Sequence, residues 1–115
     1  MRPRRGARAE IRQTMTRKVK GKKEVIRERS MTVKIPNAEE LIGDGHANVS
    51  RTRTLKMAVP DTFGTSISAS CTVALTCNQS DATIHKTAKL CNRIIEKLME
   101  DDQAEMASFV EAMSV

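Results

Sequence analysis

The most regular pattern in the sequence is an unbroken alternation of apolar and small residues between positions 66 and 77. Serine and threonine hold most of the positions between the apolar ones. A period of two places successive side chains on opposite faces of a β-strand. The sequence therefore predicts a long strand with one buried face and one face in water. The residues of the predicted buried face are Ile67, Ala69, Cys71, Val73, Leu75 and Cys77.

A second strand is predicted just upstream of the first. Residues 52–59 also alternate, with Leu55, Met57 and Val59 on one face. Residues 60–65 contain Pro, Asp and Gly, which are typical of a turn because each favours a bend in the backbone. The two alternating runs are therefore expected to pair as an antiparallel hairpin.

Further strand signals lie closer to the N-terminus. Met31, Val33 and Ile35 alternate with polar residues, which indicates a third strand within residues 24–35. Apolar residues also alternate with basic ones near Gly21, and this fits a basic hairpin.

A helix is predicted after the long strand, because the apolar period changes beyond Cys77. Ser80 is a suitable N-cap, and Asp81 interacts favourably with the helix dipole in the first turn. Residues 100–102 indicate a break or a weak continuation. A second short stripe within residues 106–113 extends the helix, packs back on the core or meets a partner. The main helical stripe is Ile84, Ala88, Cys91, Ile95 and Leu98.

These elements predict an α+β fold, in which an antiparallel β-hairpin or three-stranded sheet is covered by one C-terminal helix, with a flexible basic N-terminal arm. We expect residues 1–30 to form the arm, partly disordered or ordered on binding, and residues 31–115 to form a small α+β domain. Such a core is small, so a homo-oligomer or a protein partner is also expected.

Charge is distributed unevenly along the chain. The first 35 residues contain 13 basic and 3 acidic residues, a net charge of +10, whereas the remainder has a net charge of −4. Residues 2–29 have few large apolar side chains, too few to stabilise an independent unit. The charge of this segment favours a polyanionic partner. A solvated tail, a targeting peptide and a docking segment for an acidic protein are the other interpretations.

The leading hypothesis is a small nucleic-acid-binding protein that contacts phosphates of DNA or RNA through this arm. The sequence contains two Phe and no Tyr or Trp, which argues against surfaces that stack bases on rings. We therefore expect backbone contacts with little sequence preference. Arg51, Arg53 and Lys56 are expected to extend the basic patch. The candidate residues of the arm are Arg2, Arg4, Arg5, Arg8, Arg12, Arg17, Lys18, Lys20, Lys22 and Lys23.

The alternative hypothesis is a structural or accessory subunit that docks in a larger protein or ribonucleoprotein assembly. Basic arms commonly enter such complexes, while a small folded body docks on protein. The serine- and threonine-rich sheet face and the methionine-containing tail would then be interfaces, since methionine side chains adapt to varied partners.

No enzymatic site emerges from the sequence. Cys71 and Cys77 share a strand face but lie about 20 Å apart at ~3.3 Å per residue, so they cannot bind one zinc ion. Cys91 is predicted to point into the core, and His46 and His85 have no nucleophile or carboxylate at a useful spacing. The cysteines are interpreted as buried apolar side chains in a reducing compartment. We therefore predict no enzyme, no metal and no cofactor.

Signals for membrane insertion and for secretion are missing from the sequence. No apolar run approaches the ~18 residues that a membrane span needs, and the N-terminus lacks the plan of a secretory signal. We expect a cytoplasmic location, or association with a nucleoid or virion, and no secretion or membrane partner.

The strand, turn, strand and helix predicted for residues 53–100 resemble the small ββα domains of phage and mobile-element accessory proteins. The run SISASCTVALTCNQSDATIHKTAKLCNRIIEKLME, which begins at Ser66, carries most of this resemblance. The resemblance implies an accessory role in nucleic-acid handling or in a virion or effector complex. It implies no particular site residues.

Overall fold

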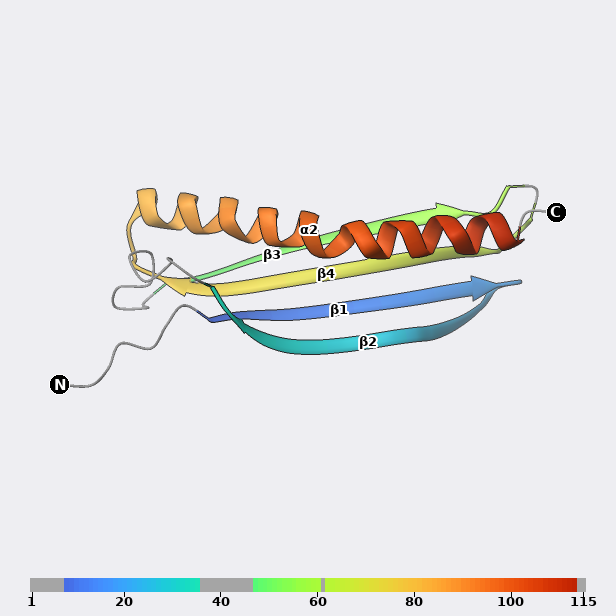
Figure 1. Ribbon diagram of the computed structural model, residues 1–115, viewed down its shortest axis with the longest axis horizontal. Helices are drawn as coiled ribbons and strands as arrows, with labels where there is room; N and C mark the ends of the chain where they lie inside the picture. The colour runs from blue at the N-terminus through green and yellow to red at the C-terminus, as the bar shows by residue number, and fades with distance from the viewer. Residues whose placement is uncertain (1–7, 36–46, 61, 114–115) are drawn as a thin grey trace.

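The computed structural model describes residues 8–35, 47–60 and 62–113. Four long strands form one antiparallel sheet, and one long helix lies along one side of it (Figure 1). The fold is therefore α+β, with a C-terminal helix on a sheet, as the sequence predicted. The elements are β1 (Arg8–Val19), β2 (Lys22–Lys34), β3 (Ala47–Ala58), β4 (Ser66–Cys77) and α2 (Asp81–Met113).

The strand order in the sheet is β2-β1-β4-β3, so two hairpins lie side by side with β1 and β4 in the centre. β3 and β4 pair from Ala47 opposite Cys77 to Ala58 opposite Ser66, which confirms the hairpin predicted from the two alternating runs. The predicted apolar face of β4 is buried along its whole length.

The sheet has four strands, whereas the predicted fold had two or three; β1 was not counted among them, although a basic hairpin near Gly21 was considered. Ala9, Ile11 and Met15 in β1 are buried, and so is Gln13, which lies on the same face. A glutamine thus interrupts the apolar face of β1, while charged residues occupy much of its other face. These polar residues hid the period of two that marks a strand.

The flexible arm predicted for residues 1–30 is wrong for residues 8–30, because these form β1 and most of β2. The basic hairpin around Gly21, also considered for this segment, is confirmed. Lys20 and Gly21 form its turn with φ angles of 51° and 82°. Positive φ at both central residues matches a two-residue turn that follows the twist of the strands. The candidate residues Arg2, Arg4 and Arg5 lie outside the described residues.

α2 is continuous over 33 residues, or about 50 Å at ~1.5 Å per residue. Ser80 caps the helix as predicted, since its Oγ accepts a hydrogen bond from the backbone N–H of Thr83 at 3.3 Å. The helix does not break at residues 100–102, where Asp102 is buried, and residues 106–113 extend it.

The core lies between α2 and one face of the sheet, with α2 packed along β4 and β3. The helix buries residues at a helical spacing, which include Cys91, Ile95, Met99 and Met106. We call the other side of the sheet the open face, because no described element covers it.

Candidate functional site

The turn of the β1–β2 hairpin concentrates lysine side chains. Lys18 lies directly opposite Lys23 in the strand register. Such opposed residues project from the same face with their Cβ atoms about 4.5–5.5 Å apart, and like charges in this position destabilise the pair. The four exposed lysines of this turn, named here the lysine tip, are Lys18, Lys20, Lys22 and Lys23.

The lysine tip contacts the loop between β3 and β4. The backbone N–H of Gly21 donates a hydrogen bond to the carbonyl oxygen of Gly64 at 3.2 Å. Gly64 has a φ of +74°, and a Cβ there would lie 3.2 Å from the Gly21 nitrogen, so this approach favours glycine. The contact brings the loop that carries Phe63, a fully exposed side chain, to the lysine tip. Figure 1 shows the ends of β1 and β3 together at this end of the molecule.

Two arginines of the same hairpin already form ion pairs with carboxylates. Arg12 pairs with Glu28 at 2.7 Å across the hairpin. Arg17 pairs with Glu24 at 2.8 Å and makes two hydrogen bonds to it. By contrast, no residue of the lysine tip forms an ion pair within the described parts of the chain. These lysines are therefore better placed than Arg12 and Arg17 to bind an external anion.

The open face is lined mainly by hydroxyl groups. Thr52 and Thr72 share a hydrogen bond at 2.9 Å, and Thr54 donates to Ser70 at 3.3 Å. Such hydroxyls donate and accept hydrogen bonds without adding charge. The strand registers place the following on this face: Thr14, Thr16, Ser30, Thr32, Ser50, Thr52, Thr54, Ser66, Ser68, Ser70, Thr72 and Thr76.

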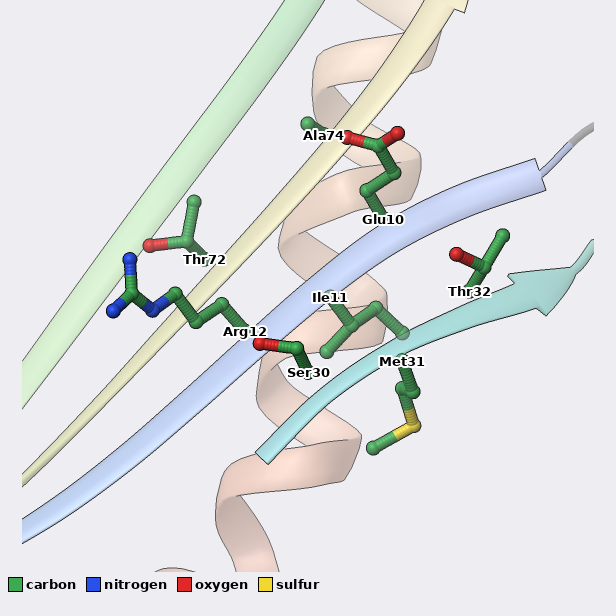
Figure 2. A pocket seen from close by; sticks show the side chains of 8 residues that line it. All are labelled: Glu10, Ile11, Arg12, Ser30, Met31, Thr32, Thr72 and Ala74. Carbon is green, nitrogen blue, oxygen red and sulfur yellow. The ribbon is translucent and has the colours of Figure 1, made fainter. Parts of the chain in front are cut away.

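A hollow of about 470 Å³ lies on the open face where β4, β1 and β2 meet. Figure 2 shows Glu10, Arg12, Ser30 and Thr72 around it. The Arg12 guanidinium in this lining is already paired with Glu28. The other polar groups of the lining are the Glu10 carboxylate and hydroxyls. The hollow therefore offers hydrogen bonds to a ligand that lies across the sheet, and it holds no set of groups arranged for acid–base or nucleophilic chemistry.

The remaining predicted residues do not form one patch with the lysine tip. Arg8 begins β1, about 33 Å from Lys18 at ~3.3 Å per residue. Arg51 and Arg53 lie opposite Val73 and Cys71, so they belong to the helix side of β3, whereas Lys56 lies opposite Ser68 on the open face. The three residues that were expected to extend the basic patch therefore lie on two different sides of the sheet.

Two residues of interest were missed by the sequence analysis. Lys34 lies directly opposite Arg8 and forms a second pair of opposed like charges, at the other end of the hairpin. Phe63 was treated only as part of a turn. The pairing of Arg8 with Lys34 could not be predicted from composition. A lone aromatic residue next to a glycine in a predicted turn, however, was a sequence signal for an exposed ring at Phe63.

The cysteines lie in the core, as predicted. Cys71, Cys77 and Cys91 are buried and free. Burial raises the pKa of the Cys71 thiol, and the Asp102 carboxylate raises it further. Burial also raises the pKa of the Cys91 thiol, against an opposing effect of Arg51. These causes keep both thiols protonated and poorly nucleophilic near neutral pH.

The described residues contain neither a cluster of metal ligands nor a membrane-spanning helix. Within residues 8–35, 47–60 and 62–113, no three His, Cys, Asp or Glu side chains gather closely enough to hold a metal ion. In the same part of the chain, no helix combines the length and apolar character needed to cross a membrane.

Comparisons of the chain with models of protein families, with curated proteins and with solved structures found no match. The resemblance of residues 53–100 to small ββα domains therefore stays a prediction.

Proposed function

We propose that this chain binds the phosphate backbone of nucleic acids through its β1–β2 hairpin, as a non-enzymatic accessory protein. The observation that carries the proposal is the lysine tip, where Lys18 and Lys23 are held opposite each other. Neither has a carboxylate partner among the described residues. A phosphate bound between the two ammonium groups would replace their repulsion with attraction to both.

The rest of the hairpin favours an extended polyanion as the ligand rather than a single small anion. Arg8 and Lys34 repeat the opposed like charges at the far end, about 33 Å from Lys18. Hydroxyls of the open face lie between the two ends, and serine and threonine commonly join lysine and arginine in contacts to phosphate and sugar. A nucleic-acid strand along this face of the hairpin would therefore meet basic side chains at both ends and hydroxyls between them, and Glu10 and Glu28 are the two carboxylates on the same path.

This mode of binding predicts little sequence preference. The hairpin is rich in charges and hydroxyls, which contact backbone groups shared by all sequences. Arg12 and Arg17 contribute less than the sequence analysis expected, because each would have to leave its carboxylate partner. DNA and RNA are both suitable ligands on this basis.

The test compares two variants of the full chain that lose the same charge. In the first, all four lysines of the lysine tip become glutamine. In the control, four exposed basic residues of α2 become glutamine, namely Lys86, Lys89, Arg93 and Lys97. Binding to a single-stranded and to a duplex oligonucleotide is then titrated against salt concentration.

The slope of log K against log salt is expected to become shallower by about 3 for the lysine-tip variant, because each lost phosphate contact removes about 0.7–0.9. The control variant should lose much less of the slope. Equal losses in the two variants would show that net charge alone drives binding, and the proposal would fail. It would also fail if the unmodified chain bound neither oligonucleotide at low salt.

One observation favours the alternative, a subunit of a larger assembly. A groove of about 580 Å³ runs between β2 and α2, and its apolar wall includes Ile11, Val33 and Leu98. Val25 and Ile26 on the same edge strand are also exposed. If copies of the chain associate through this edge, Leu98→Asp should lower the mass measured by light scattering to that of one chain. A single-chain mass before substitution would count against self-association.

A further inference from the structure

The loop between β3 and β4 holds the most exposed aromatic side chain of the protein. Phe63 is 100% exposed. The sequence has only two phenylalanines and no tyrosine or tryptophan. The other one, Phe109, packs against the hydrophobic core. The ring of Phe63 thus makes no contribution to the core, although the chain is poor in aromatic residues.

Hydrogen bonds hold the described residues on both sides of this ring. The backbone N–H of Val59 donates to the carbonyl oxygen of Thr65 at 3.1 Å, which closes the loop at its base. Thr62 donates twice inside the loop, from its backbone N–H to Val59 O at 3.4 Å and from its Oγ1 to Pro60 O at 3.2 Å. An aromatic side chain on such a loop loses little conformational freedom when it meets a ligand.

The loop is also fixed to the lysine tip. Gly64, which follows Phe63 directly, accepts a hydrogen bond from Gly21, and the ideal Cβ position of Gly64 lies 3.6–3.7 Å from backbone atoms of Lys20. The exposed ring and the exposed ammonium groups therefore occupy one end of the molecule. Aromatic rings beside basic side chains form the combination that proteins use to hold single strands, because the ring stacks on a base while the cations contact phosphates.

We propose that Phe63 stacks on an unpaired base of the nucleic acid whose phosphates occupy the lysine tip, so that the preferred ligand is single-stranded. This inference rests on the proposed function. In a duplex, neighbouring bases cover both faces of each base, whereas an unpaired base has a face free for the ring. Stacking also agrees with little sequence preference, since every base has such a face.

The first experiment uses Phe63→Trp, which introduces the single tryptophan of the chain. Its fluorescence is followed while an oligothymidine of about 12 nucleotides is added. An abasic oligonucleotide of the same length keeps the phosphates and lacks the bases. The oligothymidine is expected to quench the tryptophan, and the abasic strand is expected to bind with little quenching. Gln103→Trp, at an exposed position of α2, is the control and should show no quenching with either ligand.

The second experiment measures affinity for the same ligands with Phe63→Ala. Affinity for oligothymidine is expected to fall about tenfold, as for the loss of one stacked base. Affinity for the abasic strand and for a duplex should stay the same, and so should the salt slope. Unchanged oligothymidine affinity would overturn the inference, as would an equal loss for all three ligands. Either result would leave the proposed function intact if the lysine-tip variant still lost its salt slope.

Discussion

The guanidinium of Arg27 on β2 forms an ion pair with the carboxylate of Asp102 on α2, although 75 residues separate them in the sequence. Asp102 is only 2% exposed, and its other oxygen accepts a hydrogen bond from Gln13 Nε2 at 3.3 Å. Arg27 also reaches Glu105 at 3.0 Å. This cluster links β2 and β1 to α2, so it holds the hairpin against the helix.

Arg27→Ala is expected to lower the free energy of unfolding by about 3 kcal/mol, because it leaves the buried carboxylate of Asp102 without its ionic partner. The arginine side chain is 34% exposed, which places the effect at the low end of the range for buried pairs. Urea unfolding followed by circular dichroism measures it. Arg12→Ala is the control, since Arg12 and Glu28 are more than half exposed, and its cost should stay below about 1 kcal/mol. Equal costs would contradict this role for Asp102.

Lys23→Glu is expected to stabilise the free protein while it weakens nucleic-acid binding. The change replaces the repulsion with Lys18 by an attraction, for a gain of about 0.5 kcal/mol that shrinks as salt is added. Thermal unfolding at low and high salt measures the gain. Lys56→Glu makes the same change of charge opposite Ser68 and should stabilise less. If Lys23→Glu destabilised the chain at low salt, the two lysines would not be repelling each other.

Gly64→Ala is expected to destabilise the protein more than Gly21→Ala. Both glycines have positive φ, so alanine is strained at either position, by about 1 kcal/mol. Only at Gly64 does an added Cβ meet another backbone, at 3.2 Å, whereas nothing lies within 4 Å at Gly21. We expect a cost of about 2 kcal/mol at Gly64. Similar costs in urea unfolding would show that the contact between the two loops contributes nothing.

The free energy of unfolding is expected to fall at alkaline pH because of the buried thiols. Burial raises the pKa of the Cys71 and Cys91 thiols above their ordinary value of 9.0 in the folded chain. Once the pH passes about 9, the unfolded chain releases these protons while the folded chain keeps them. The unfolded state then binds fewer protons, so the free energy of unfolding falls as pH rises, and the thiols have no such effect at neutral pH.

Urea unfolding between pH 7 and pH 10.5 tests this, with the double variant Cys71→Ala and Cys91→Ala for comparison. The variant is expected to lose stability less steeply above pH 9, whatever its stability at pH 7. Lysines titrate in the same range in both proteins, so the difference between the two slopes isolates the thiols. Parallel curves would rule out the effect.

The sequence predicted most of the residues of the candidate site, but it did not predict how these residues are arranged in space. All four lysines of the lysine tip could be predicted, because a local excess of charge is visible in the sequence. The sequence does not distinguish them from Arg12 and Arg17, since each carboxylate partner of these arginines comes from the opposite strand of the hairpin. Phe63 gained its significance only from the contact of its loop with Gly21.

The sequence by itself determined those helices and strands whose periodicity and capping residues lie within the element itself. The alternation from Ile67 to Cys77 predicted β4, the stripe from Ile84 to Leu98 predicted the first half of α2, and Ser80 predicted its start. The pairing of β3 with β4 followed because a short turn joins them.

The tertiary structure alone decided the position of β1 and the path of α2 beyond residue 100. β1 carries Gln13 and α2 carries Asp102 at core positions, and each polar group is satisfied by partners far away in the chain. β1 also pairs with β4, whose residues lie 48 to 64 positions later in the chain, to complete the centre of the sheet. A buried polar group is stable only when its partner is in place, and that partner is supplied by the folded chain.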